Sequence, residues 1–312
     1  MKTRLLTIAI GLCMALPAGA VTQVLVVAGM GGEPQYEERF QKWTDQVAHT
    51  SLSVAGDAAR VQRLAGNDAR REKITAAIRA AADKLQSGDH FVLVLVGHGS
   101  FDGNDYRFMI PGDDITGNDI QKLMDGFTKG VSQLVVNATS TSGAIVDKLA
   151  GPQRVVIAAT KSGGERQATR FGEYWAEALG SGDADKDKDG NVTAQEAFDF
   201  ANRKVVESFK SDAAIATEHA RIAGSDPGRF VVARLGAAAL FANDSQLAAL
   251  RAEQDGIELR IDQLRAQKAD LPADDYYNRL EPVMLDMARL GQRIDARLAQ
   301  LGVNEGGSRD AR

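Results

Sequence analysis

Short apolar runs alternate with longer stretches of helical periodicity between residues 23 and 235. Most of the runs are rich in Val, Leu and Ile without polar alternation, which is typical of strands buried on both faces of a sheet. Such alternation predicts an α/β fold with a mostly parallel sheet and helices on both faces. The predicted strands are 23–28, 60–64, 91–96, 133–136, 154–159 and 230–235, and the predicted helices are 33–49, 72–85, 143–149, 171–179 and 194–209.

Two further segments stand apart from this alternation. Residues 101–111, with Asp102-Gly103 and a following Pro111-Gly112, predict a turn-rich hairpin. After Gly236 the chain becomes charged and periodic, and two apolar seams meet near Pro272, which predicts an antiparallel helical hairpin over 243–301. The first seam comprises Leu247, Leu250, Ile257, Ile261, Leu264 and Leu271, and the second comprises Leu280, Val283, Met287, Leu290, Ile294, Leu298 and Leu301.

The role of this helical hairpin has two interpretations. Its helices could pack onto the α/β domain, or they could form a projecting, coiled-coil-like arm for self-association or partner docking. Gln254 and Lys268 interrupt the first seam, and such polar positions argue against a long isolated coiled coil. Residues 302–312 predict a frayed tail.

The N-terminal segment has the pattern of a secretory signal peptide over 1–20. Lys2 and Arg4 precede a short apolar run over 5–16, and Ala18-Gly19-Ala20 is a small-residue cleavage site. The run is too short to span a bilayer, and no later stretch approaches about 20 apolar residues, so we expect no membrane span. The mature chain is therefore expected in the periplasm, with an extracellular location as the alternative.

The net charge and the cysteine count exclude some classes of partner and of catalytic chemistry. The 312 residues carry a formal charge of −5, which becomes −7 without Lys2 and Arg4, so a nucleic-acid partner is not expected. Cys13 is the single cysteine and lies in the signal segment. The mature chain would thus have no disulfide, no thiolate nucleophile and no thiolate metal site.

Residues 185–196 match the spacing of an EF-hand calcium loop. Carboxylates occupy positions 1, 3 and 5, glycine occupies position 6 for the sharp turn, and a glutamate closes position 12. The alternative is an acidic surface turn without metal. Because only one such loop is present, a structural Ca²⁺ is expected rather than a sensor. The predicted ligands are Asp185, Asp187, Asp189, Asn191 through its backbone carbonyl, Thr193 and Glu196.

Two polar turns follow predicted strands, where α/β proteins build their sites. Gly97-His98-Gly99 comes directly after 91–96, and the hydroxyl-rich turn 137–143 comes after 133–136. A hydroxyl of this turn could be a nucleophile activated by His98. The alternative is that these hydroxyls cap a helix, a position that Ser and Thr favour.

A strand ending in His-Gly, followed by a second strand ending in an Ala-nucleophile-x-Ser-Gly turn, resembles the caspase–legumain clan of cysteine peptidases. Further stretches resemble secreted, legumain-type bacterial caspase-like proteins, over 22–236 in all. The resemblance implies a caspase-like domain over 21–236 with a six-stranded, mostly parallel sheet, and His98 as general base. The stretches are Gly31-Gly32-Glu33-Pro34, 159–166, Thr169-Arg170-Phe171-Gly172 and the calcium-type loop leading into Glu196-Ala197-Phe198.

The clan's cysteine is absent from the hydroxyl-rich turn. Alignment from Ala138 puts Thr139 in its place, and alignment back from Ser142-Gly143 puts Ser140 there. An alcohol needs stronger base assistance than a thiol, and it needs an oriented histidine, for which Asp102 and Asp105 are the candidate carboxylate partners.

Two functions of the protein are compatible with these residues. The first is a non-catalytic, calcium-stapled pseudoenzyme that binds a polypeptide; the alternative is a peptidase using Ser140 or Thr139 with His98.

Overall fold

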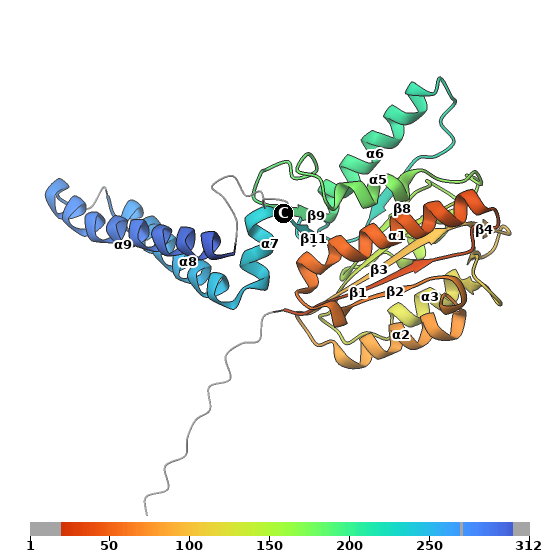
Figure 1. Ribbon diagram of the computed structural model, residues 1–312, viewed down its shortest axis with the longest axis horizontal. Coiled ribbons are helices and arrows are strands. Elements are labelled where there is room, and N and C mark those ends of the chain that lie inside the picture. The colour runs from red at the N-terminus through yellow and green to blue at the C-terminus, as the bar shows by residue number, and fades with distance from the viewer. Residues whose placement is uncertain (1–19, 269–270, 302–312) are drawn as a thin grey trace, which may run out of the picture.

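The computed structural model describes residues 20–268 and 271–301 (Figure 1). The predicted signal peptide and the predicted tail 302–312 therefore lie outside the described residues, apart from Ala20. A six-stranded sheet has the order β10-β8-β7-β3-β1-β2, in which β10 is antiparallel to β8 and all other neighbours are parallel. The α/β fold is thus confirmed. The strands are β1 (Thr22–Ala28), β2 (Val61–Leu64), β3 (His90–Gly97), β7 (Ser132–Thr139), β8 (Arg154–Ala158) and β10 (Arg221–Ala223).

Helices cover both faces of this sheet (Figure 1). In β1, Val24 and Val26 pack with α1, α5 and α6, whereas Leu25 and Val27 pack with α2, α3 and α4. A run of apolar residues is required because successive side chains enter opposite cores. The helices are α1 (Pro34–Ala55), α2 (Arg71–Lys84), α3 (Gly117–Met124), α4 (Val146–Leu149), α5 (Phe171–Ala178) and α6 (Ala194–Ser211).

Two elements differ from the expectation. The run 230–235 contains β11 (Val231–Arg234), but this strand pairs with β9 (Asn191–Thr193) in a separate two-stranded sheet. The edge of the main sheet is instead β10, whose residues are all half-buried, so no apolar run marks it in the sequence. The predicted helix 143–149 is divided into a 3₁₀ turn, Ser142–Ile145, followed by α4.

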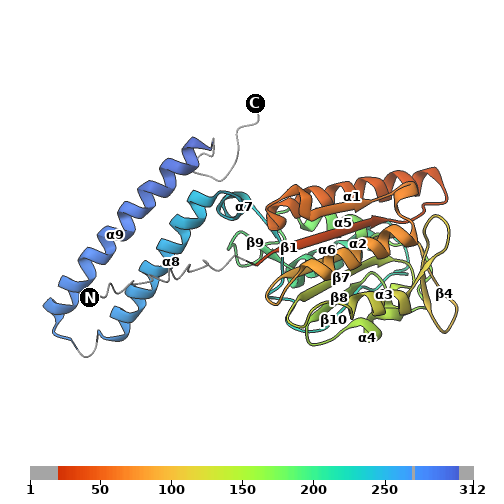
Figure 2. The same ribbon diagram turned by 90° about the horizontal axis from the view of Figure 1, so that it is seen from below.

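The predicted hairpin after His98 is present as a small antiparallel sheet. Its strands are β4 (Gly99–Phe101), β5 (Tyr106–Phe108) and β6 (Ile115–Thr116). Because β4 follows β3 almost immediately, it marks the carboxyl end of the parallel strands (Figure 2).

The C-terminal helices project away from the sheet as an arm, defined here as α7 (Gly236–Asn243), α8 (Ser245–Ala266) and α9 (Ala273–Gln300) (Figures 1 and 2). The arm leaves from the end of the sheet opposite to β4. Leu247, Leu250, Ile257 and Ile261 of the first seam and Leu290 of the second are buried against one another.

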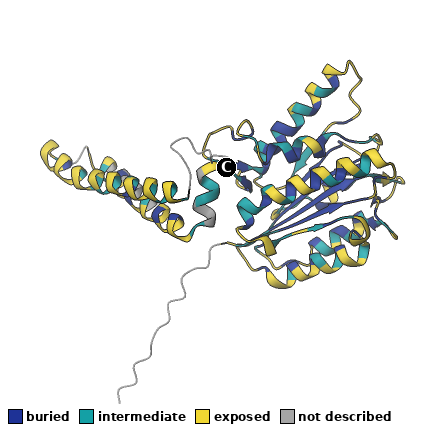
Figure 3. Cartoon of the chain, viewed as in Figure 1, coloured by how far each residue is buried: buried dark blue, intermediate teal, exposed yellow. Residues whose placement is uncertain are grey.

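The arm projects from the α/β domain, while its use in self-association or partner docking stays a prediction. Most of its surface is exposed, in contrast to the buried strands of the sheet (Figure 3). At its root, Arg297 on α9 forms an ion pair of 2.6 Å with Asp244 at the start of α8. None of the helices that the structure describes is both long and apolar enough to span a bilayer.

Candidate functional site

The ring of His98 lies between the carboxyl end of β3 and the first turns of α1. Tyr36 and Phe40 on α1 meet the ring edge to face, with centroids 4.9 and 5.1 Å away. Nε2 lies 3.2 Å from the carbonyl oxygen of Gly31, which can only accept, so Nε2 carries the proton in this contact. In the neutral ring, Nδ1 is therefore the atom that could accept a proton.

The hydroxyl of Ser140 is bonded to the backbone beside His98. Its Oγ accepts from the amide of Gly99 and donates to the carbonyl of the same residue, both at 3.1 Å. A Cβ at Gly99 would lie 2.4 Å from the Ser140 carbonyl oxygen, so only glycine permits this approach. Ser140 thus takes the position of a strand partner at the outer edge of β4, and its side chain is not hydrogen-bonded to His98.

Thr139, the other candidate nucleophile, is fully buried in a different network. Its Oγ1 lies 2.6 Å from the hydroxyl of Tyr106 and donates to Oδ1 of Asn137 at 2.8 Å. Burial raises the pKa of Tyr106 above its usual range, so the phenol keeps its proton and can donate to Thr139. This network joins β5 to β7 and has the character of a structural support.

Thr141 is the strained residue of the hydroxyl-rich turn. It adopts φ 58°, a left-handed conformation that β-branched residues rarely take. Its amide donates to the carbonyl of Glu165 at 2.8 Å, while its own hydroxyl is buried without a hydrogen-bond partner. No sequence pattern marks this conformation, because the residue that bonds the Thr141 amide is 24 positions away.

The carboxylates proposed as partners of His98 are bonded elsewhere. Asp102 accepts from backbone amides within the β4–β5 turn and pairs with Arg107 at 3.2 Å. Asp105 accepts from Asn118 at 2.5 Å and lies 3.7 Å from the Lys148 ammonium. In the described part of the chain, neither carboxylate is bonded to His98.

Two exposed methionines lie beside His98. The amide of Met30 donates to the carbonyl of Met109 at 3.0 Å, and the amide of Met109 donates to the carbonyl of His98 at 3.1 Å. Their side chains are 43% and 38% exposed, unlike most large apolar side chains of the domain. Methionine adapts readily to partner surfaces, so these residues add exposed apolar surface next to the backbone of His98.

Acidic groups missed at the sequence level connect the hydroxyl-rich turn to the chain before β10. Nδ1 of His219 lies 2.5 Å from Oε1 of Glu165, and this contact joins the loop after β8 to the chain before β10. Burial alone would raise the pKa of Glu165, but hydrogen bonds from Lys161 and His219 outweigh it and lower that pKa.

Glu218 is the buried neighbour of this pair. Its carboxylate accepts from the amides of Arg170 and Phe171 at 2.7 and 2.9 Å and so caps the N-terminus of α5. Burial nevertheless raises the pKa of Glu218 to about 7. Its distance in sequence from α5 explains why no local pattern revealed it.

The calcium-type loop brings three of the predicted ligands together. One carboxylate oxygen each from Asp185, Asp187 and Asp189 lies within 4.8 Å of the others. Asn191 and Thr193 bound the short strand β9, which leads directly into α6. The strand β9, which follows the cluster, lies near the root of the arm, whereas β4, which follows His98, lies at the opposite end of the sheet (Figure 2).

The sixth predicted ligand, Glu196, lies in a capping box. Its carboxylate accepts from the amide and hydroxyl of Thr193 at 2.9 and 2.8 Å and from the amide of Lys186 at 2.9 Å. Burial opposes ionisation, yet these hydrogen bonds lower the pKa of Glu196. Glu196 thus ties the two ends of the loop together, and its role as a metal ligand stays a prediction.

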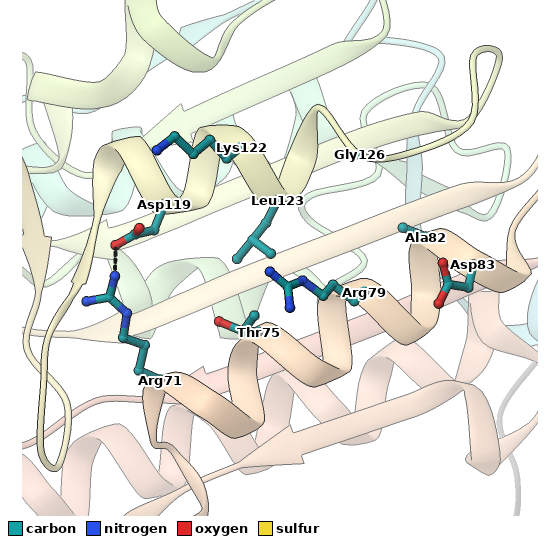
Figure 4. A pocket seen from close by; sticks show the side chains of 9 residues that line it. All are labelled: Arg71, Thr75, Arg79, Ala82, Asp83, Asp119, Lys122, Leu123 and Gly126. Atoms are coloured by element: carbon teal, nitrogen blue, oxygen red, sulfur yellow. Dashed lines mark hydrogen bonds and ion pairs between the residues drawn. The ribbon is translucent and has the colours of Figure 1, made fainter.

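A cavity of about 350 Å³ lies between α2 and α3 (Figure 4). Arg71 and Asp119 cross one side of it with an ion pair of 2.7 Å, and Arg79 extends along it from α2. The cavity contains none of the predicted site residues, so it is separate from the His98 site.

Comparison with known proteins adds little to this geometry. No protein-family profile matches the chain, and no curated protein sequence matches it. Among solved structures, the crystal structure of protein GSU0716 from Geobacter sulfurreducens is similar with a TM-score of 0.47 and 14% identity, over 70% of this chain and 98% of that chain. A similarity this weak carries no argument about function.

Proposed function

We propose that the chain is a non-catalytic, caspase-like protein of the periplasm that binds a polypeptide at the carboxyl end of its sheet. The proposal is supported chiefly by Ser140, whose hydroxyl is hydrogen-bonded to both the amide and the carbonyl of Gly99. A nucleophile must give its proton to a base and reach the substrate. Here the hydroxyl of Ser140 donates its hydrogen bond to the Gly99 carbonyl and not to a base, and the residue is only 3% exposed.

The polypeptide ligand is inferred from the surroundings of His98. A half-buried histidine at the strand ends, with exposed Met30 and Met109 on the adjoining backbone, offers a hydrogen-bonding group together with apolar surface. Small-molecule sites are usually enclosed and largely apolar, whereas Met30 and Met109 are exposed. The resemblance to a peptidase clan favours the same class of ligand.

The alternative function, a hydrolase with His98 as base and Ser140 or Thr139 as nucleophile, is favoured by one observation. The contact between Nε2 and the Gly31 carbonyl orients the ring and leaves Nδ1 as the proton acceptor. An oriented imidazole of this kind is what a base requires.

A peptide-library experiment distinguishes the two functions. The mature protein is immobilised and incubated with the library, and mass spectrometry then identifies retained and cleaved peptides. We expect retention without cleavage, lost in His98→Ala and kept in the control His49→Ala, because His49 is exposed on α1. Cleavage that disappears in His98→Ala would instead establish the hydrolase. If the unmodified protein neither retains nor cleaves any peptide, both functions are contradicted.

Self-association through the arm belongs to the same proposal. Tyr277, Met284 and Leu285 on α9 are each about half exposed, at 58%, 49% and 50%. Tyr277 and Met284 are seven residues apart and so share a face of the helix. A second copy of the arm could cover this apolar face.

A further inference from the structure

Asp185 is a buried carboxylate with an oxygen that nothing in the described chain satisfies. The residue is 5% exposed, and its Oδ2 accepts from the amide of Gly190 at 3.0 Å. Its Oδ1 is buried and has no hydrogen-bond partner among the described residues. A buried charge without a partner is costly, so this atom points to a ligand that completes the site.

The surroundings of that oxygen are acidic. Asp187 and Asp189 each bring a carboxylate oxygen into the same cluster, within 4.8 Å. The loop's lysines turn elsewhere, since Lys186 pairs with Asp199 at 3.2 Å and Lys188 donates to the Gly182 carbonyl at 2.6 Å. No ion pair to the three aspartates occurs among the described residues. Three carboxylates without a counter-ion repel one another, and a hard divalent cation offsets this repulsion.

The backbone holds the three aspartates in this arrangement. Gly190 has φ 83°, a conformation that glycine adopts without strain and that turns the chain sharply after Asp189. Val192 is fully buried in the domain core and pairs with Ala233 of β11. The strand β11 therefore holds the end of the loop 185–196 in place through its pairing with β9.

The same loop is bonded to the root of the arm. The amide of Leu235, which precedes α7, donates to the Gly190 carbonyl at 2.8 Å. A Cβ at Gly190 would lie 2.9 Å from Cβ of Ala238 on α7, so helix and loop are in close contact. The loop residue that shapes the aspartate cluster is thus also the residue on which α7 rests.

We propose that residues 185–196 bind Ca²⁺ through Asp185, Asp187 and Asp189, and that the bound ion fixes the root of the arm through Gly190. Metal binding would hold the loop in one conformation, which keeps the Gly190 carbonyl in place for Leu235. The strand β9 of this loop and the strand β4 that follows His98 lie at opposite ends of the sheet (Figure 2), and the proposal uses no residue of the His98 site.

The first test measures metal binding by thermal unfolding of the mature chain in EGTA, in millimolar Ca²⁺ and in millimolar Mg²⁺. Ca²⁺ is expected to raise Tm by about 5 °C, and Mg²⁺ by less. Asp185→Asn should lose the Ca²⁺ shift, yet its Tm in EGTA should equal or exceed that of the unmodified chain, because an unpaired buried charge has been removed.

A matched control is Asp183→Asn, because Asp183 is exposed in the same loop region and lies outside the cluster. It should keep the full Ca²⁺ shift. No Ca²⁺ shift in the unmodified chain, or an undiminished shift in Asp185→Asn, would overturn the metal site.

The second test measures hydrogen exchange of the peptides covering 231–243, with and without Ca²⁺. Exchange at Leu235 and in the first turn of α7 should slow by about tenfold in Ca²⁺. The slowing should persist in Asp183→Asn and vanish in Asp185→Asn. Ca²⁺ binding without slower exchange there would overturn the coupling to the arm.

Discussion

Ser140 satisfies both backbone polar groups of Gly99 with a single hydroxyl, through two hydrogen bonds of 3.1 Å. The two residues are 41 positions apart, so this contact joins the hydroxyl-rich turn to the outer edge of β4. It explains why a serine stands beside His98 without being bonded to it.

Ser140→Ala is therefore expected to lower the free energy of unfolding by about 1–3 kcal/mol, because the partly buried amide and carbonyl of Gly99 lose their partner. Denaturant unfolding measures the change. Ser100→Ala is the control, since Ser100 is exposed on the same strand, and it should stay within about 0.5 kcal/mol of the unmodified chain. A Ser140→Ala variant as stable as the control would show that the hydroxyl is not a structural support.

The buried carboxyl of Glu218 predicts a pH dependence of stability. Burial raises its pKa from 4.5 to about 7. Between these values the folded chain binds more protons than the unfolded chain, so the free energy of unfolding falls as pH rises through this window. The loss is on the order of 3 kcal/mol and is complete above the folded-state pKa.

Glu218→Gln removes the titrating group and should flatten this component of the profile. The measurement is denaturant unfolding of both proteins at about pH 5 and about pH 8. Glu207→Gln, at an exposed position on α6, should retain the profile of the unmodified chain. Equal profiles for all three proteins would show that Glu218 does not titrate in this range.

The central sheet could be predicted because its strands bury both faces and therefore read as apolar runs, such as 91–96 and 154–159. The edge strand β10 could not, since Arg221–Ala223 are only half-buried and nothing apolar marks them. The run containing β11 was found but assigned to the wrong sheet, because an apolar run specifies burial and not its pairing partner.

The candidate site was predictable only in part. His98 follows a strand, and the loop 185–196 has a fixed ligand spacing, so both stand out in a single segment. The contacts that escaped prediction join distant segments: Glu165 meets His219 across 54 positions, and Glu218 meets Arg170 across 48. The choice between Thr139 and Ser140 likewise depended on Tyr106 and Gly99, which no local pattern connects to the turn.

Self-association of the arm can be tested on its exposed apolar face. Light scattering after size exclusion should give the mass of two chains for the unmodified protein. Met284→Lys combined with Leu285→Lys should give the mass of one chain, because two charges would be buried at the interface.

The control adds the same charge to exposed polar positions on α8 and at its C-cap, with Gln263→Lys and Gln267→Lys together. This variant should keep the mass of two chains. A single-chain mass for the unmodified protein at every concentration would contradict self-association.

The contact between Gly190 and Ala238 predicts how the arm depends on the calcium-type loop. Gly190→Ala forces an alanine into φ 83° and places its Cβ against α7, so it should lower the free energy of unfolding by about 2–4 kcal/mol. Gly112 has φ 87° with open space around it. Gly112→Ala therefore introduces the backbone strain without a steric clash, and it should lower the free energy of unfolding by about 1–2 kcal/mol.

A second substitution separates the steric part from the conformational part. Ala238→Gly removes the atom that Ala at position 190 would strike, so the pair should be less destabilising than the sum of the single changes by about 1 kcal/mol or more. Combined with Gly112→Ala, the same Ala238→Gly change should be additive, because that glycine does not touch α7. Denaturant unfolding of the five variants gives both cycles, and additivity in the Gly190 cycle would mean that the loop and the root of the arm are not in contact in solution.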